Sequence, residues 1–249
     1  MQARKLPAIA GWRWLQGGLK LWLRSPGVIS LATLLTLLLT LLPGVIPLLG
    51  PLLASLVTPF LYVVLLHVFR RLAGGGAPQL NRLQGRLMRM QRGLLVLGLV
   101  LFLAALAGQG LLVLFQGEAL ARYFQAVAKG GQGTVTAGLQ IGLMLYALGV
   151  FALSAVIWVS SALTGFAQLP PMKSLVFAVV ACWRNKLAFA VFALALVLLS
   201  VPLMLLFALV GMGAMLTLLF GVLTPVSFAC MHFCITDIFG PLPEPDDAR

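Results

Sequence analysis

The chain has 249 residues, of which 61% are hydrophobic and 9% are charged, and its mean hydropathy is +1.09. A soluble globular domain is about half apolar and about a quarter charged, so this composition excludes a water-soluble particle. The formal net charge is +12. We expect no nucleic-acid partner, because the basic residues follow the pattern of a membrane protein, as described below.

The first segment with a clear pattern is Ala8–Leu23. Its aromatic and aliphatic residues recur at helical spacing while its basic residues occupy another face, and the apolar positions are Trp12, Leu15, Leu19 and Trp22. Tryptophan and leucine on one side with arginine and lysine on the other are typical of a helix that lies in the membrane interface. We therefore predict that Trp12 and Trp22 lie at the lipid headgroups.

Six stretches are long and apolar enough to cross a membrane, which takes about 20 residues. They are residues 27–46, 52–71, 93–115, 138–160, 187–209 and 214–236. None of them has Asp, Glu or Lys in its interior. The sequence thus predicts an all-α, polytopic membrane bundle of six transmembrane helices in three hairpins, forming a single domain over residues 1–239.

Two further cytoplasmic segments precede the second and third hairpins. In Leu80–Met90, an apolar stripe faces away from three arginines, Arg82, Arg86 and Arg89. We predict that this helix lies in the interface and that its arginines meet anionic headgroups. The segment Met172–Lys186 is more apolar and too short to span, so it is either interfacial or buried against the bundle.

The basic residues are distributed unevenly between the two sides of the predicted bundle. All of them except Arg122 and Lys129 fall in the N-terminal segment, in alternate connections or in the tail, on one side. The positive-inside rule places that side in the cytoplasm. We therefore predict a multi-pass protein of the bacterial inner (cytoplasmic) membrane with both termini in the cytoplasm.

An internal repeat is suggested by the order of one interfacial helix and two membrane helices, which occurs three times in one orientation. The first and third copies share a Thr-Pro pair within the second membrane helix, Thr58–Pro59 and Thr224–Pro225. Proline removes a helical hydrogen bond and crowds the carbonyl four residues back. We predict kinks at both pairs, which either shape a cavity or improve packing.

Two histidines are the candidates for chemistry within the spans, His67 and His232. An ionisable residue in a membrane segment is a functional candidate, and the alternative is a neutral ring hydrogen-bonded to a backbone carbonyl. A metal site from Cys230, His232 and Cys234 is not expected. On one helix His232 points about 200° away from Cys230, so the three cannot meet one ion.

Catalytic motifs are absent from the sequence. It has no nucleotide-binding glycine loop, no H-E-x-x-H and no paired carboxylates, so we expect no enzyme, no cofactor and no metal. Aligning the two Thr-Pro pairs places Asp237 opposite Arg71, which predicts that Asp237 meets Arg70 or Arg71. The tail, residues 240–249, is rich in proline and acid and is expected to be disordered.

Three short segments resemble a known group of proteins: Gly11–Trp14, Leu21–Pro26 and Ile46–Leu53. They resemble a family of uncharacterised proteobacterial six-pass inner-membrane proteins. That family is similar in layout to the membrane domain fused to some glycerophosphodiester phosphodiesterases. The resemblance implies an inner-membrane location and six helices. It implies no catalytic residue, and this chain carries no phosphodiesterase domain.

Two functional hypotheses from different classes follow. The first is a non-enzymatic module that organises lipid or serves as an accessory scaffold. Its partners would be membrane lipids, with anionic headgroups at the cytoplasmic face, and another membrane protein. The alternative is a transporter or permease for a small or amphiphilic solute. The lack of intramembrane carboxylates argues against ion coupling in such a transporter.

Overall fold

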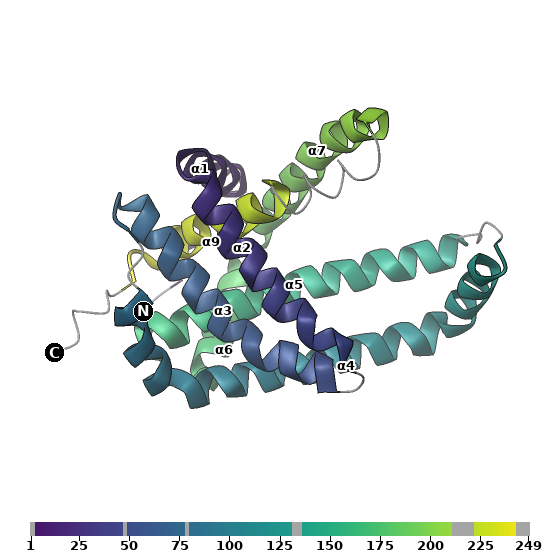
Figure 1. Ribbon diagram of the computed structural model, residues 1–249, viewed down its shortest axis with the longest axis horizontal. Helices are drawn as coiled ribbons and strands as arrows, with labels where there is room; N and C mark the ends of the chain where they lie inside the picture. The colour runs from purple at the N-terminus through teal and green to yellow at the C-terminus, as the bar shows by residue number, and fades with distance from the viewer. Residues whose placement is uncertain (1–2, 47–48, 78–79, 131–135, 211–221, 243–249) are drawn as a thin grey trace.

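The computed structural model describes residues 3–46, 49–77, 80–130, 136–210 and 222–242. Every regular element in these ranges is helical, which confirms the predicted all-α fold (Figure 1). The elements are α1 (Ala10–Arg24), α2 (Pro26–Leu41), the 3-10 turn η1 (Leu42–Val45), α3 (Leu49–Ala73), α4 (Leu80–Ala128), α5 (Ala137–Ala167), α6 (Pro171–Arg184), α7 (Lys186–Val210) and α9 (Thr224–Phe239).

Four of these segments are long and apolar enough to cross a membrane: α2 together with η1, α3, α4 and α5. The helices α6 and α7 would make a fifth span if they are taken together, but they bend by 74° where they join. The predicted fifth span falls within α7. The predicted sixth span starts outside the described residues, and its described part forms the shorter apolar helix α9. The structure therefore supports four to five spans.

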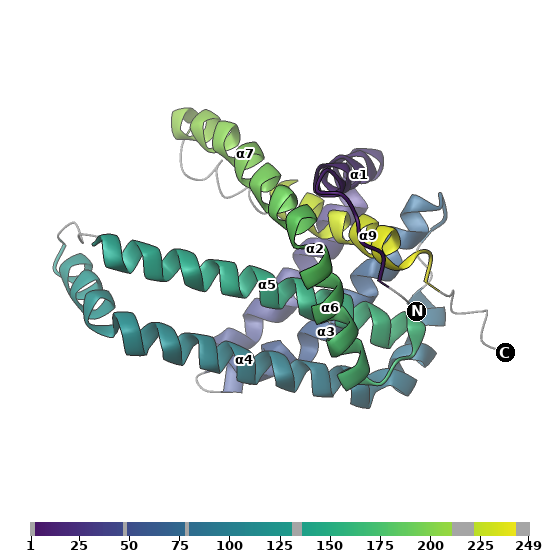
Figure 2. The same ribbon diagram turned by 180° about the vertical axis from the view of Figure 1, so that it is seen from behind.

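We expected the segment Leu80–Met90 to form a separate helix, but it does not. It forms the first turns of α4, which continues for 49 residues to Ala128, about 73 Å at 1.5 Å per residue. The reason lies in the residue that joins each interfacial segment to the membrane span after it. Pro26 follows the end of α1, whereas the corresponding point before the third span has only Gly93, which costs a helix about 1 kcal/mol. As a result α4 and α5 form a long hairpin that projects beyond the other helices (Figures 1 and 2).

The helix α1 packs against protein along one face. Trp14 is 1% exposed, and its ring lies 5.2 Å from that of Phe189 in α7. Leu15 of the predicted apolar stripe is buried, but Trp12 is 44% exposed. The face of α1 that packs on protein is the one with Gly11 and Gly18, which let α1 approach the backbones of α7 and α9.

The helices pack in a regular order. The helix that begins each predicted unit packs against the second membrane helix of the unit before it: α4 on α3 and α6 on α5. Likewise α1, which begins the first unit, packs on α9, the second membrane helix of the third unit. The three second helices, α3, α5 and α9, contact one another in the middle. This is the order that a threefold repeat predicts, although the repeat itself stays a prediction.

Away from this centre the described helices expose large apolar side chains. Examples are Leu114 on α4 (75% exposed), Leu145 on α5 (64%) and Leu198 on α7 (63%). A monomeric soluble protein rarely exposes so much contiguous apolar surface. Helices are also the form in which a chain satisfies its backbone groups inside lipid. Together these features indicate that lipid surrounds the outer parts of the bundle.

Candidate functional site at the axis of the bundle

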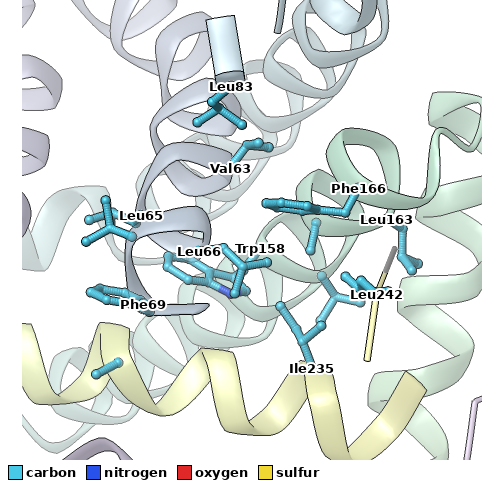
Figure 3. Close-up of a cluster of buried hydrophobic side chains, with 14 of the residues drawn as sticks. Val63, Leu65, Leu66, Phe69, Leu83, Trp158, Leu163, Phe166, Ile235 and Leu242 are labelled. Atoms are coloured by element: carbon cyan, nitrogen blue, oxygen red, sulfur yellow. The ribbon is translucent and has the colours of Figure 1, made fainter. Parts of the chain in front are cut away.

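An aromatic cluster joins the three central helices. Tyr62 of α3 lies 4.5 Å from Trp158 of α5, measured between ring centroids, and Trp158 lies 5.3 Å from Phe228 of α9. The third pair, Tyr62 and Phe228, is 6.1 Å apart. Figure 3 shows Trp158 within the cluster of buried side chains to which α3, α5 and α9 contribute. We call the line along which these helices meet the axis.

Further side chains on the axis follow from helical geometry, because residues four apart share a helix face. One turn away from the predicted cytoplasmic end, the positions equivalent to the aromatic cluster all carry hydroxyl groups. One turn toward that end they carry two apolar residues and a histidine, and two turns toward it an arginine, a phenylalanine and a threonine. These three layers are Thr58, Ser154 and Thr224; then Leu66, Ala162 and His232; then Arg70, Phe166 and Thr236.

The layer nearest the predicted cytoplasmic end shows that this register holds between α3 and α5. The guanidinium carbon of Arg70 lies 4.9 Å from the centroid of the Phe166 ring. Each of these two residues follows its partner in the aromatic cluster by eight positions, or about two helical turns. The Arg70 charge therefore lies at the predicted cytoplasmic end of the axis.

Two ring nitrogens near the axis are buried without a hydrogen-bond partner in the described part of the chain. Trp158 is 3% exposed and His232 is 8% exposed. The unpartnered atoms are Nε1 of Trp158 and Nδ1 of His232. Buried polar atoms in proteins are nearly always hydrogen-bonded, so these two nitrogens mark the axis as a place where a further group could bind.

The two histidine candidates occupy different environments. His67 is 2% exposed, but it follows Tyr62 by five residues and so lies about 140° around α3 from the axial face. His232 follows Phe228 by four and shares its face. The structure therefore brings only His232 to the axis. No group of three metal-binding side chains occurs among the described residues.

The two Thr-Pro pairs also differ. Pro59 is buried inside α3, and the hydroxyl of Thr58 donates to the carbonyl of Ala54 over 2.7 Å. Pro225 instead stands in the first turn of α9, directly after a π-helical turn at residues 222 and 223. Proline is tolerated at that position because the first N–H groups of a helix have no partner within it.

The predicted lipid-facing residues belong to α1 and to the start of α4, which lie away from the tip of the α4–α5 hairpin (Figures 1 and 2). Trp12 is exposed, and Trp22 donates from its indole nitrogen to the Ser30 hydroxyl over 3.0 Å. The side chains of Arg82 and Arg86 lie outside the described part. Exposed basic residues on these helices include Arg13, Lys20, Arg24, Arg89, Arg92, Lys173 and Arg184.

The predicted contact of Asp237 with Arg70 or Arg71 is not confirmed. A carboxylate oxygen of Asp237 accepts a hydrogen bond from the indole nitrogen of Trp14 over 2.9 Å. Arg70 donates to the carbonyl of Leu242 over 2.6 Å, and Leu242 is buried. The contact of Asp237 with an arginine therefore stays a prediction. The first residues of the predicted tail are packed as far as Leu242, and residues 243–249 lie outside the described part.

One functional contact that sequence reasoning missed is Asn185, at the bend between α6 and α7. Its side chain is 1% exposed and accepts from the backbone N–H of Leu6 over 2.8 Å. Its amide nitrogen donates to the carbonyls of Arg4 and Ala181. Beside it, the N–H of Arg4 donates to the carbonyl of Ile238, so the two ends of the described chain meet here.

Comparisons with known proteins add one short match. Over 57 residues the chain is 39% identical to a probable inner membrane protein of Burkholderia thailandensis. The match covers 23% of this chain and 21% of the relative, so it spans about a fifth of each protein. No protein-family model and no solved structure matches the chain.

The match and the apolar helices together support an integral, multi-pass protein of a bacterial inner membrane from an uncharacterised family. The similarity in layout to the phosphodiesterase membrane domain stays a prediction.

Proposed function

We propose that this protein is a non-enzymatic module of the bacterial inner membrane that gathers anionic lipid at its cytoplasmic face and serves as an accessory partner of another membrane protein. The proposal includes the six-span layout in three hairpins with both termini in the cytoplasm. The observation that carries it is the set of exposed basic side chains on α1, α6 and the start of α4, helices that lie away from the tip of the α4–α5 hairpin (Figures 1 and 2).

Electrostatics explains why such a surface would select lipids. Each lysine or arginine near an anionic leaflet contributes about 1 kcal/mol of attraction. The apolar positions of these helices, such as Trp12 and Leu23, are exposed beside the basic ones and can enter the headgroup region.

The test is to extract the full chain together with its surrounding lipid in native nanodiscs and to measure the lipid composition. Replacing Arg82, Arg86 and Arg89 with glutamine should lower the fraction of phosphatidylglycerol and cardiolipin. The matched control replaces Arg122 and Lys129, the basic residues of the opposite side, with glutamine and should leave that fraction unchanged. The same lipid composition in wild type and triple variant would contradict the proposal.

The transporter alternative is favoured by a separate observation, the polar groups on the axis. Three hydroxyl-bearing positions and His232 line up along α3, α5 and α9. None of the axial positions carries a carboxylate, so such a transporter would not be coupled to ions through membrane carboxylates.

A further inference from the structure

We propose that the axis between α3, α5 and α9 is a binding site for the acidic head of an anionic amphiphile, held by Trp158 Nε1 and His232 Nδ1. This site is separate from the basic cytoplasmic face, and its test can fail independently of the proposed lipid-organising role. The proposal is built from the two unpartnered nitrogens, the nearby charge and the apolar surroundings.

The two nitrogens define what the ligand must offer. An indole N–H can only donate, so the atom that meets Trp158 must accept a hydrogen bond. Leaving a buried donor unsatisfied costs about 1–3 kcal/mol, which is a reason to expect a partner. His232 lies one turn from Phe228, whose ring packs on Trp158 at 5.3 Å, so the two nitrogens belong to side chains of neighbouring layers of the axis.

The positive charge of Arg70 near the axis determines which charge the ligand should carry. Arg70 lies over the Phe166 ring, one further turn toward the cytoplasmic end, and no axial position carries a carboxylate. In surroundings of low dielectric constant a fixed positive charge favours an anion. A carboxylate or a phosphate group meets both conditions.

The neighbouring side chains indicate an amphiphile instead of a small inorganic ion. Leu66 and Ala162 occupy the layer of His232, and the rings of Tyr62 and Phe228 lie directly beyond it. These apolar surfaces can cover an alkyl chain while the head reaches the nitrogens. A fatty acid and an acidic phospholipid share this chemistry, and the experiment separates them.

The experiment uses the full chain in dodecyl maltoside, with oleate as the carboxylate probe and phosphatidylglycerol as the phosphate probe. Native mass spectrometry should find one bound anion per chain, and whichever probe binds names the source. Trp158→Phe removes the N–H and keeps an aromatic ring, so affinity should fall about 3- to 10-fold. Trp183→Phe, at a position 71% exposed on α6, should leave the affinity unchanged.

Three results would overturn the proposal. They are no stoichiometric binding of either anion, equal affinity in wild type and Trp158→Phe, and equally tight binding of neutral phosphatidylcholine. The first would leave internal water as the partner of both nitrogens. If Trp158→Phe shows no cooperative unfolding transition, His232→Phe replaces it with the same expected loss of affinity.

Discussion

At the scale of single residues, two membrane helices approach each other closely at Gly98 of α4. A Cβ atom there would lie 2.6 Å from the Cα atom of Leu56 and 2.7 Å from the carbonyl oxygen of Ser55. That carbonyl is the one that Pro59 deprives of its helical donor. The absent side chain thus lets α4 cover the backbone of α3 at the turn before Pro59.

Replacing Gly98 with alanine should therefore lower the free energy of unfolding by about 1–3 kcal/mol, the usual cost of forcing atoms into a packed contact. The matched control is Gly110→Ala in the same helix, where a Cβ meets nothing within 4 Å. Alanine is a better helix former than glycine, so this control should be neutral or stabilising by up to about 1 kcal/mol. Unfolding in mixed micelles, followed by circular dichroism, measures both. Equal losses would contradict the close approach.

Asn185 gives a second test at this scale. Asn185→Ala removes a side chain that bonds Leu6 N–H and the Arg4 and Ala181 carbonyls. Buried polar groups left without partners should cost about 1–3 kcal/mol and free the N-terminal segment. Limited proteolysis should cut the variant before α1 sooner than wild type. Gln16→Ala, at an exposed position of α1, serves as the control, and unchanged cleavage in Asn185→Ala would count against this tie.

At the scale of elements, α1 is held to α9 through Gly18. A Cβ atom on Gly18 would lie 2.4 Å from the Cys230 sulfur and 2.8 Å from its backbone nitrogen. Gly18→Val should displace α1 and expose Cys230, which is 1% exposed in the native protein. With Cys182 and Cys234 changed to serine, maleimide should label Cys230 faster in the valine variant. Gly27→Val, which has open space around its Cβ, should leave the labelling rate at that of the parent, and the same rate in Gly18→Val would disprove the contact.

The predicted elements agree with the structure where local sequence signals determine the ends of a helix. They differ from it where contacts between distant segments determine which face of a helix is buried. Apolar runs of span length located α2, α3 and α5, because lipid demands such runs. Pro26 marks the boundary between α1 and α2. In α4 no helix-terminating residue separates Leu80–Met90 from the third span, and the spacing of apolar residues does not show whether two such segments join into one helix. The buried face of α1 could not be assigned, because its partners on α7 and α9 are about 175 or more residues away in the chain.

Only part of the candidate site could be predicted from the sequence. His232 was named as a candidate, yet the aromatic cluster was not, although Tyr62 and Phe228 each follow the proline of a Thr-Pro pair by three residues. Trp158 has no such pair beside it, since Ser154 and Ala155 stand in its place. Nothing in the sequence indicated that Asn185 is buried, because its burial depends on contact with the N-terminal segment, which is distant in the chain.

At the scale of the whole molecule, the account depends on orientation. The helices pack together around the axis, and the α4–α5 hairpin projects away from it (Figures 1 and 2). The helices α1, α6 and the start of α4, which carry exposed basic residues, lie away from the tip of that hairpin, near which Arg122 and Lys129 stand in the sequence (Figures 1 and 2). The positive-inside rule then predicts that α1 and α6 face the cytoplasm and that the hairpin tip faces the periplasm.

The most direct test of this orientation is a set of reporter fusions in a bacterial host, with alkaline phosphatase and green fluorescent protein joined after residues 80, 130 and 249. The account predicts phosphatase activity without fluorescence for fusions after residue 130. It predicts fluorescence without phosphatase activity for fusions after residues 80 and 249. A fluorescent, phosphatase-negative fusion after residue 130 would contradict it.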